Sequence, residues 1–340
     1  MLNILYHIKL VGATAFNLTS ILPKKIQPIL ANIKLTENCN SRCITCTYWR
    51  TVHRDKISTE RAIQLLDEIY KLGIKNIRFT GGEPLLRRDF FKILETRNET
   101  DFHKVCLATN GLLLEKFKDQ INNSIITNIT VSLDGIGKNN DEIRGIEGYY
   151  DIVIRGLSKI NKRIKIVSTI SKILVNDLED LILLCKDKGW DYDVNLPENN
   201  LYFFKSEEVK KTLETLWPSE RDVDKIIEIL AKHNILTEDL LQNIKLYFSK
   251  KKFKFSHCVQ GFVEVNIDSN GNVRSGCYVF KPIGNIINSS LKEIINSKPY
   301  IESVFKMYKL ECPGCACGYA ISCIYENPLA NLRYIVKRLK

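Results

Sequence analysis

Three cysteines on one short stretch are the residues of this chain best suited to chemistry. Cys39, Cys43 and Cys46 are separated by three and then by two residues, and they follow a short apolar run at residues 33–36. Three thiolates on one loop can bind three irons of a cubane [4Fe–4S] cluster, which leaves the fourth iron without a protein ligand. Because a small molecule can chelate that open iron, the spacing indicates catalysis rather than electron storage alone. The alternatives are a zinc site or unpaired structural thiols, although three cysteines without a close fourth suit tetrahedral zinc poorly.

Two glycines and a glutamate lie one strand further along the chain. Gly81, Gly82 and Glu83 follow the strand predicted at residues 76–80. Glycines let a backbone approach a ligand closely, and the Glu83 carboxylate can bind an ammonium group. Together with the cysteine spacing, this pattern resembles the signature of radical S-adenosylmethionine (SAM) enzymes, in which this strand end contacts the amino group of SAM. The resemblance implies a SAM-binding [4Fe–4S] cluster on the three cysteines.

The resemblance also implies roles for polar residues at the next two strand ends. Thr109 and Asn110 end the third predicted strand, and Ser132 and Asp134 end the fourth. Taken alone, both read as ordinary strand-to-helix turns, but in the family such residues contact the ribose and the carboxylate of SAM. Ser132 and Arg144 resemble the pair that holds the SAM carboxylate in sulfatase-maturating enzymes. A guanidinium suits this role because it donates two parallel hydrogen bonds to a carboxylate.

A second group of cysteines lies near the end of the chain. The first two, Cys258 and Cys277, flank a predicted hairpin with an Asn-Gly turn at residues 270–271. A helix expected from about Ser290 and a C-x2-C sequence follow, an order that resembles the SPASM/twitch extension of radical SAM enzymes. Because position 321 is Ile and no cysteine follows residue 323, the resemblance implies the shorter twitch form with one auxiliary [4Fe–4S] cluster. A zinc ribbon is the alternative. The candidate ligands, of which the first four would suffice, are Cys258, Cys277, Cys312, Cys315, Cys317 and Cys323.

Strands and helices alternate from residue 31 onward, and this order predicts the fold class. Six strands that alternate with helices predict a parallel sheet, and we expect an α/β fold with a partial (β/α)6 TIM-like barrel. A small, cysteine-rich α+β extension, a hairpin plus a helix, follows at the C-terminus. Active sites of such sheets lie at the carboxyl ends of the strands, where the motifs of the barrel fall. The predicted strands are residues 32–35, 76–80, 105–109, 129–133, 164–170 and 192–196, and the helices between them are residues 59–72, 89–96, 112–121, 149–161 and 176–188.

Changes in sequence character divide the chain into five segments. The first is apolar and is expected to form a helix packed on the barrel, with an interfacial membrane helix as the alternative. It lacks the basic start and the cleavage site of a signal peptide and is too polar for a spanning helix. The segments are an apolar N-terminus (1–30), the radical SAM core (31–197), a bridging segment with helices at 221–233 and 237–250 (198–256), the auxiliary cluster domain (257–325) and a basic tail (326–340).

Composition and charge limit the compartment and the partners. The 11 cysteines gather mainly in two groups, which indicates metal binding rather than a disulfide framework and hence a reducing, cytoplasmic compartment. The net charge of +11 is spread along the chain without a nucleic-acid-reading motif, so we expect no nucleic acid partner. A basic face would instead attract an acidic electron donor such as flavodoxin or ferredoxin. The apolar N-terminus and the basic tail would allow a weak association with a membrane surface.

The family resemblance implies a reaction but not a substrate. It implies reductive cleavage of SAM to methionine and a 5′-deoxyadenosyl radical, which abstracts a hydrogen atom from the substrate. The single auxiliary cluster favours a small molecule, such as a sugar, aminocyclitol or nucleoside, that is oxidised or epimerised. A SPASM-type peptide or protein maturase is the alternative, although few residues precede the barrel. A non-enzymatic iron–sulfur or zinc-binding electron-transfer scaffold would not bind SAM. Residues 83–87 and 132–135 also resemble the molybdenum cofactor cyclase, whose C-terminal cysteine spacing differs.

Overall fold

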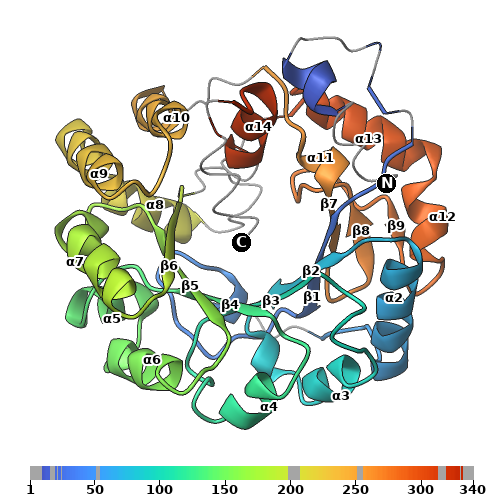
Figure 1. Cartoon of the computed structure of the whole chain (residues 1–340), viewed down its shortest axis with the longest axis horizontal. Coiled ribbons are helices and arrows are strands. Elements are labelled where there is room, and N and C mark those ends of the chain that lie inside the picture. Colours follow the sequence, from blue (N-terminus) through green and yellow to red (C-terminus); the bar gives the residue numbers. More distant parts are fainter. Residues whose placement is uncertain are drawn as a thin grey trace.

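A curved sheet organises the structure. The computed structural model describes residues 10–15, 20, 22–23, 25–50, 54–197, 207–250, 256–312, 319–329 and 331. In this part of the chain nine strands form one sheet, in the order β6-β5-β4-β3-β2-β1-β7-β8-β9. Figure 1 shows these strands as an arc with helices around its outer side.

The first six strands are parallel and confirm the predicted partial barrel. Each neighbour in the order β1 to β6 pairs with the next in parallel. All six predicted strands are present, and no end differs from its prediction by more than two residues. They are β1 (Leu30–Thr36), β2 (Asn76–Gly81), β3 (Lys104–Thr109), β4 (Asn128–Ser132), β5 (Arg163–Thr169) and β6 (Asp191–Asn195).

Helices follow these strands and cover the outer face of the sheet (Figure 1). The helix predicted at residues 112–121 is reduced to α4 at the end of that stretch. Helix α5, which ends at Arg144, was not predicted, because its seven residues are mostly polar and carry no apolar repeat. The limits of α5 are set by the two glycines that flank it, Gly137 and Gly145. The helices are α2 (Thr59–Lys71), α3 (Phe90–Leu94), α4 (Lys118–Asn122), α5 (Lys138–Arg144), α6 (Tyr149–Leu157) and α7 (Leu174–Asp187).

The two faces of the sheet differ in chemistry. In β1 the side chains of Ile33 and Leu35 belong to the apolar core under the helices. Because successive side chains of a strand point to opposite faces, Asn32 and Lys34 point to the inside of the arc. Arg78 in β2 is likewise exposed between two buried apolar residues. The inner face is therefore polar, as expected of a surface that meets a ligand rather than a core.

The C-terminal hairpin continues the barrel sheet. Strand β7 (Glu264–Ile267) pairs in parallel with β1 and antiparallel with β8 (Asn272–Arg274), which in turn pairs with β9 (Gly284–Asn285). This confirms the predicted hairpin and adds a pairing that the sequence did not reveal. At the junction the buried Asn32 Nδ2 donates a hydrogen bond of 2.8 Å to Asn266 Oδ1. The segment with the second cysteine group is thereby tied to the strand that precedes the first group.

Further helices lie beyond both ends of the arc (Figure 1). Beyond β6 lie α8 (Glu207–Leu216), α9 (Glu220–Lys232) and α10 (Glu238–Lys250), of which the last two match the helices predicted at residues 221–233 and 237–250. Near β7 lie α11 (Gln260–Val263), α12 (Leu291–Ile295) and α13 (Lys298–Tyr308), while α14 (Tyr319–Glu326) lies between α10 and α11. Helix α12 begins after Ser290, as predicted, and the Ser290 side chain accepts a hydrogen bond from Glu293 N.

The described part of the N-terminal segment is helical and packed on the protein. Residues 10–15 are in a helical conformation, and Leu10 and Ala13 have no exposed surface. Full burial of two apolar side chains three residues apart agrees with the expected packed helix. Within the residues that the structure describes, no helix combines the length and the apolar character needed to cross a membrane.

Candidate active site

The first cysteine group lies on the loop that follows β1. Its backbone runs beside the end of α5, where Arg42 N donates to Arg144 O at 3.2 Å and Ile44 N donates to Ile143 O at 3.0 Å. Gly145 permits this approach, since a Cβ atom there would lie 2.2 Å from Arg42 O, and its φ of 69° is in the left-handed region. The three cysteines of the loop are half-buried and free of disulfides.

Polar groups surround the thiols of this loop. Asn110 Nδ2 and Arg144 Nη1 lie 3.7 Å from the sulfurs of Cys39 and Cys43, respectively, and Ser41 Oγ lies 3.0 Å from Cys43 Sγ. Such N–H and O–H donors stabilise the negative charge of metal-bound thiolates. Burial raises the pKa of Cys39, and raises that of Cys46 to about 11, so these thiols need a metal to hold them deprotonated.

The described thiols do not form a compact site for a single ion. Among the residues that the structure describes, no three His, Cys, Asp or Glu side chains converge closely enough to hold one metal ion. In a cubane each thiolate binds a different iron, so its sulfurs stand further apart than those around one zinc. The three cysteines of the loop match a [4Fe–4S] cluster with one open iron in number and in the N–H and O–H donors around their sulfurs.

The two glycines at the end of β2 hold the cysteine loop in place. A Cβ atom on Gly81 would lie 2.1 Å from Thr36 O, and one on Gly82 would lie 2.1 Å from Asn38 O. Because neither glycine has a Cβ atom, Gly82 N donates to Thr36 O at 3.0 Å and Glu83 N donates to Asn38 O at 2.8 Å. The sequence predicted a close approach of these glycines to a ligand, whereas the close approach in the structure joins two backbones of the chain.

The Glu83 carboxylate is fully buried and bonded within the protein. Thr109 Oγ1 lies 2.9 and 2.8 Å from its two oxygens, Asn110 N donates at 2.8 Å, and Leu85 N donates at 3.1 Å. Burial raises the pKa of Glu83 to about 7, although these hydrogen bonds act in the opposite direction. The carboxylate joins the ends of β2 and β3 and leaves the Asn110 side chain facing Cys39.

Arg144 and Asp134 form a buried ion pair beside the cysteine loop. Arg144 Nη2 lies 2.6 Å from Asp134 Oδ2, and Thr169 N donates to Asp134 Oδ1 at 2.7 Å. The Nε atom of Arg144 is buried and has no hydrogen-bond partner among the described residues. Ser132 is the last residue of β4 and is half-buried. The structure therefore places Arg144 beside the cysteine loop and gives it a partner, Asp134, that sequence reasoning did not assign to it.

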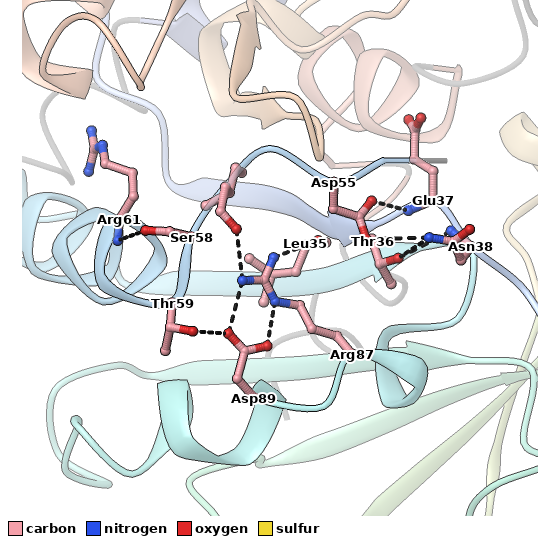
Figure 2. Close-up of polar contacts among 11 residues, drawn as sticks. Leu35, Thr36, Glu37, Asn38, Asp55, Ser58, Thr59, Arg61, Arg87 and Asp89 are labelled. Carbon is pink, nitrogen blue, oxygen red and sulfur yellow. Dashed lines mark hydrogen bonds and ion pairs between the residues drawn. The ribbon is translucent and has the colours of Figure 1, made fainter. Parts of the chain in front are cut away.

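Arg87 is a positioning residue that the sequence analysis missed. Figure 2 shows its guanidinium between the end of β1 and the start of α2. It donates to Leu35 O at 2.8 Å and Ile57 O at 2.9 Å, and its Nε lies 2.7 Å from Asp89 Oδ1. Thr59 Oγ1 also donates to Asp89 at 2.5 Å. Nothing in the spacing of Arg87 and Asp89 indicates which carbonyl groups the guanidinium will meet, so no sequence signal identified it.

The second cysteine group separates into two environments. Cys258 and Cys277 are buried and share a small apolar cluster with Met307. Cys312 is half-buried, whereas Cys323 lies in α14 within the main apolar core, where burial raises its pKa to about 12. The structure thus brings the first two candidate ligands together and places Cys323 in other surroundings. Cys315 and Cys317 lie outside the described residues.

Two family models match the chain in the regions built around these cysteines. The radical SAM superfamily model matches residues 33–187, and the model of an iron–sulfur cluster-binding domain, SPASM, matches residues 258–318. The chain therefore carries a domain of the radical SAM superfamily, followed by a SPASM domain. Enzymes of this superfamily need a [4Fe–4S] cluster and SAM, and SPASM domains bind auxiliary iron–sulfur clusters.

Curated relatives are similar over part of their length. The GTP 3′,8-cyclase of Synechocystis is 27% identical over 172 residues, which cover 49% of this chain and 52% of that protein. A probable GTP 3′,8-cyclase of Methanocaldococcus jannaschii is 27% identical over 63% of this chain and 71% of its own length. The Fe-coproporphyrin III synthase of Methanosarcina barkeri is 29% identical over 45% of this chain and 40% of its own length. The chain thus spans roughly half the length of the curated relatives it matches.

Solved structures of radical SAM enzymes share the fold. SuiB of Streptococcus suis, bound to S-adenosylmethionine, has a TM-score of 0.64 and 16% identity, over 82% of this chain and 67% of SuiB. The enzyme anSMEcpe with bound AdoMet has a TM-score of 0.61 and 16% identity, over 92% of this chain and all of its own. At this identity the likeness establishes the fold and confirms the TIM-like architecture.

A methyl group on Gly82 should prevent assembly of the first cluster. In Gly82→Ala the new Cβ atom would meet Asn38 O, a backbone atom that cannot rotate away, so the loop must move. We expect the variant to bind about four irons fewer per chain than the wild type after anaerobic reconstitution, as measured by iron and sulfide analysis. Gly73→Ala is the control for a methyl group that meets nothing, since no described atom lies within 4 Å of the Gly73 Cβ position, although its positive φ of 74° makes this alanine the more strained of the two in its backbone. Equal iron in Gly82→Ala and wild type would contradict the role of this contact.

Proposed function

We propose that this enzyme cleaves SAM reductively to a 5′-deoxyadenosyl radical, which abstracts a hydrogen atom from a small molecule that is thereby oxidised or epimerised. The observation that carries the proposal is the loop of Cys39, Cys43 and Cys46, whose thiols lie beside Asn110 and Arg144. A cluster held there supplies the electron for cleavage when it is bound. The surrounding residues position SAM and exclude water from it.

The ends of β2, β3 and β4 supply the groups that we assign to SAM. The amino group is assigned to the strand end at Gly81, Gly82 and Glu83, where the backbone rather than the bonded Glu83 carboxylate is the contact surface. The SAM carboxylate is assigned to Arg144, because its Nε lacks a hydrogen-bond partner among the described residues. A buried guanidinium donor without a partner is costly, and a carboxylate oxygen would satisfy it.

The remaining polar residues at these strand ends complete the proposed SAM site. Ser132 is assigned to the SAM carboxylate together with Arg144, while Asp134 holds the Arg144 guanidinium through the 2.6 Å ion pair. Asn110 faces the cysteine loop at the end of β3 and is assigned to the ribose. The Thr109 hydroxyl donates a hydrogen bond to the Glu83 carboxylate and thereby holds the end of β2 in position.

The auxiliary cluster that we propose is single and lies in the SPASM domain. Cys258 and Cys277 share one apolar cluster, which supports their joint role as ligands. Cys312 and Cys315 are assigned as the other two, and Cys323 is not needed because it belongs to the main core. An electron lost by the substrate would leave through this side of the barrel.

The choice of a small-molecule substrate rests on the curated relatives. The names GTP 3′,8-cyclase and Fe-coproporphyrin III synthase refer to small molecules. A peptide substrate is the second candidate, because a solved structure with the same fold is that of SuiB bound to the precursor peptide SuiA. The likeness to SuiB concerns the fold, at 16% sequence identity, whereas the curated relatives are 27–29% identical in sequence. We therefore favour a small-molecule substrate over a peptide.

Reduced protein should cleave SAM even without its substrate. We expect anaerobically reconstituted wild-type protein to release 5′-deoxyadenosine, measured by liquid chromatography, and Cys43→Ala to release none because one cluster ligand is lost. Cys185→Ala is the matched control, since Cys185 is buried in α7 as part of the apolar core and should leave cleavage intact. Wild-type protein with a full complement of iron and no cleavage would refute the proposal.

SAM affinity should depend on the shape of the Arg144 side chain and not on its charge alone. The Arg144→Lys change keeps one positive charge but removes the planar set of N–H donors. We expect this variant to weaken SAM binding by about 1–3 kcal/mol, or roughly 5- to 150-fold, in calorimetric titrations of reconstituted protein. Unchanged affinity in both Arg144→Lys and Arg144→Ala would remove Arg144 from the SAM site.

We also propose that an acidic electron donor docks beside the first cysteine group. Arg42 and Arg50 are exposed, and their guanidinium carbons lie 5.3 and 4.7 Å from the centre of the Trp49 ring between them. Trp49 Nε1 donates to Cys43 O at 2.8 Å, so this patch lies directly on the cysteine loop. Arg50 pairs with the exposed Glu208 at 3.1 Å. Two cations on an aromatic ring at this position suit a protein with an acidic surface, such as flavodoxin.

Charge reversal in this patch should slow reduction by a protein donor and not by a small reductant. We expect Arg42→Glu to lower the rate of cluster reduction by flavodoxin about tenfold at low ionic strength, because complementary charges speed association. The difference should shrink with added salt. Reduction by dithionite should stay unchanged, and Lys292→Glu, an exposed change on α12, should behave as wild type. Equal slowing by Arg42→Glu and Lys292→Glu would assign the effect to net charge.

A further inference from the structure

Lys34 is a buried cation on the inner face of the barrel. It lies near the end of β1 with 8% of its surface exposed, at the register position of Thr80. Its ammonium contacts the Tyr48 hydroxyl and lies 3.7 Å from the centre of the Tyr278 ring. The cation is thus held by one phenol oxygen and one ring face, contacts that favour its charged form.

The two tyrosines come from the two cysteine segments. Tyr48 follows Cys46 by two residues, and Tyr278 follows Cys277 by one. Lys34 itself stands next to the glycine end of β2, since a Cβ atom on Gly81 would lie 3.4 Å from its own Cβ. The ammonium therefore lies between the loop of the first cluster and the segment of the auxiliary cluster. In the proposed reaction the substrate gives a hydrogen atom to the 5′-deoxyadenosyl radical, which forms at the first cluster, and an electron to the auxiliary cluster. It must therefore occupy the region between the two.

Lys34 differs from neighbouring inner cations because it has no carboxylate partner within the described part of the chain. Among these residues it forms no ion pair, whereas Arg274 pairs with Asp268 at 2.6 Å and Lys165 pairs with Asp193 at 3.6 Å. Burial lowers the pKa of Lys34, but Tyr278, Tyr48 and, to a smaller extent, the Glu37 carboxylate outweigh it, so the net pKa lies above its usual value and the ammonium is charged at neutral pH. Because no carboxylate of the described residues forms an ion pair with this buried cation, an anion brought by a ligand would supply the direct pairing that it lacks.

We propose that the Lys34 ammonium binds an anionic group of the substrate, a carboxylate or a phosphate, and that Tyr48 and Tyr278 hold the ammonium in position for it. The substrate class is therefore a small molecule that carries a negative charge. The location of the substrate rests on the proposed function, whereas the anion site rests on the contacts of Lys34 and on its lack of an ion pair among the described residues.

Anion binding can be measured without SAM, reductant or the natural substrate. Reconstituted full-length protein is titrated by calorimetry at constant ionic strength with inorganic phosphate and, separately, with acetate. We expect wild type to bind at least one of them, Lys34→Met to bind it at least tenfold more weakly, and Lys34→Arg to stay within about threefold of wild type. Binding of phosphate alone would indicate a phosphorylated substrate, and binding of acetate would indicate a carboxylate.

Matched variants separate this site from other cations of the barrel. Arg78→Gln removes an inner cation from the neighbouring strand, level with Asn32 rather than with Lys34, and should bind as wild type does. Arg144→Gln removes the cation assigned to the SAM carboxylate, which is a second place for acetate when SAM is absent, and this variant should retain the part of the anion binding that depends on Lys34. Melting temperature and iron content verify that each variant is folded, and Lys34→Gln replaces Lys34→Met if the latter fails that check.

Two results would overturn the anion site. Wild-type protein that binds neither phosphate nor acetate would do so, and so would equal binding by wild type and the neutral Lys34 variants. Loss of binding in Arg144→Gln but not in Lys34→Met would move the site to Arg144. SAM cleavage is assayed on separate samples, so a failure of the proposed function and a failure of the anion site give different results.

Discussion

The active site depends on a backbone contact between the end of β2 and the start of the cysteine loop. Gly81 and Gly82 let β2 pass so close to Thr36 and Asn38 that two N–H groups donate across the gap. The loop that carries three thiols is thereby fixed by hydrogen bonds to a rigid sheet instead of by packing of its own side chains. Such support is needed because a cluster with an open iron must present that iron in one direction.

Two buried charged groups reinforce this contact from opposite sides. The Arg87 guanidinium ties the end of β1 to the start of α2, and the Glu83 carboxylate ties the end of β2 to that of β3. Each group is paired or hydrogen-bonded, as burial of a charge requires. The pairing of β7 with β1 then extends the same sheet to the second cysteine group. The two regions that we propose to hold clusters are thus joined by one sheet, and Lys34 lies between them.

The sequence predicted the features that a local pattern of residues encodes, namely the barrel strands and the motifs at their ends. The alternation of apolar residues located all six barrel strands, and the cysteine spacing and the glycine pair located the site at their carboxyl ends. Helix α5 was not predicted, because its polar residues carry no period and its limits come from glycine geometry. The pairing of β7 with β1 joins residues more than two hundred positions apart, which no local signal encodes. For the same reason the contacts of Arg87, and the partner that Asp134 provides for Arg144, emerged only from the structure.

The central claim is that the Cys39 loop holds a cluster whose open iron binds SAM through its amino and carboxylate groups. The most direct test is electron–nuclear double resonance on the reduced protein with SAM labelled with ¹³C at the carboxylate. The account predicts a hyperfine coupling between the cluster spin and this carbon, because a carboxylate bound to iron shares its spin density. The coupling should be present in wild type and absent in Cys43→Ala. A fully reduced, iron-replete wild-type protein that shows no coupling with saturating SAM would contradict the account.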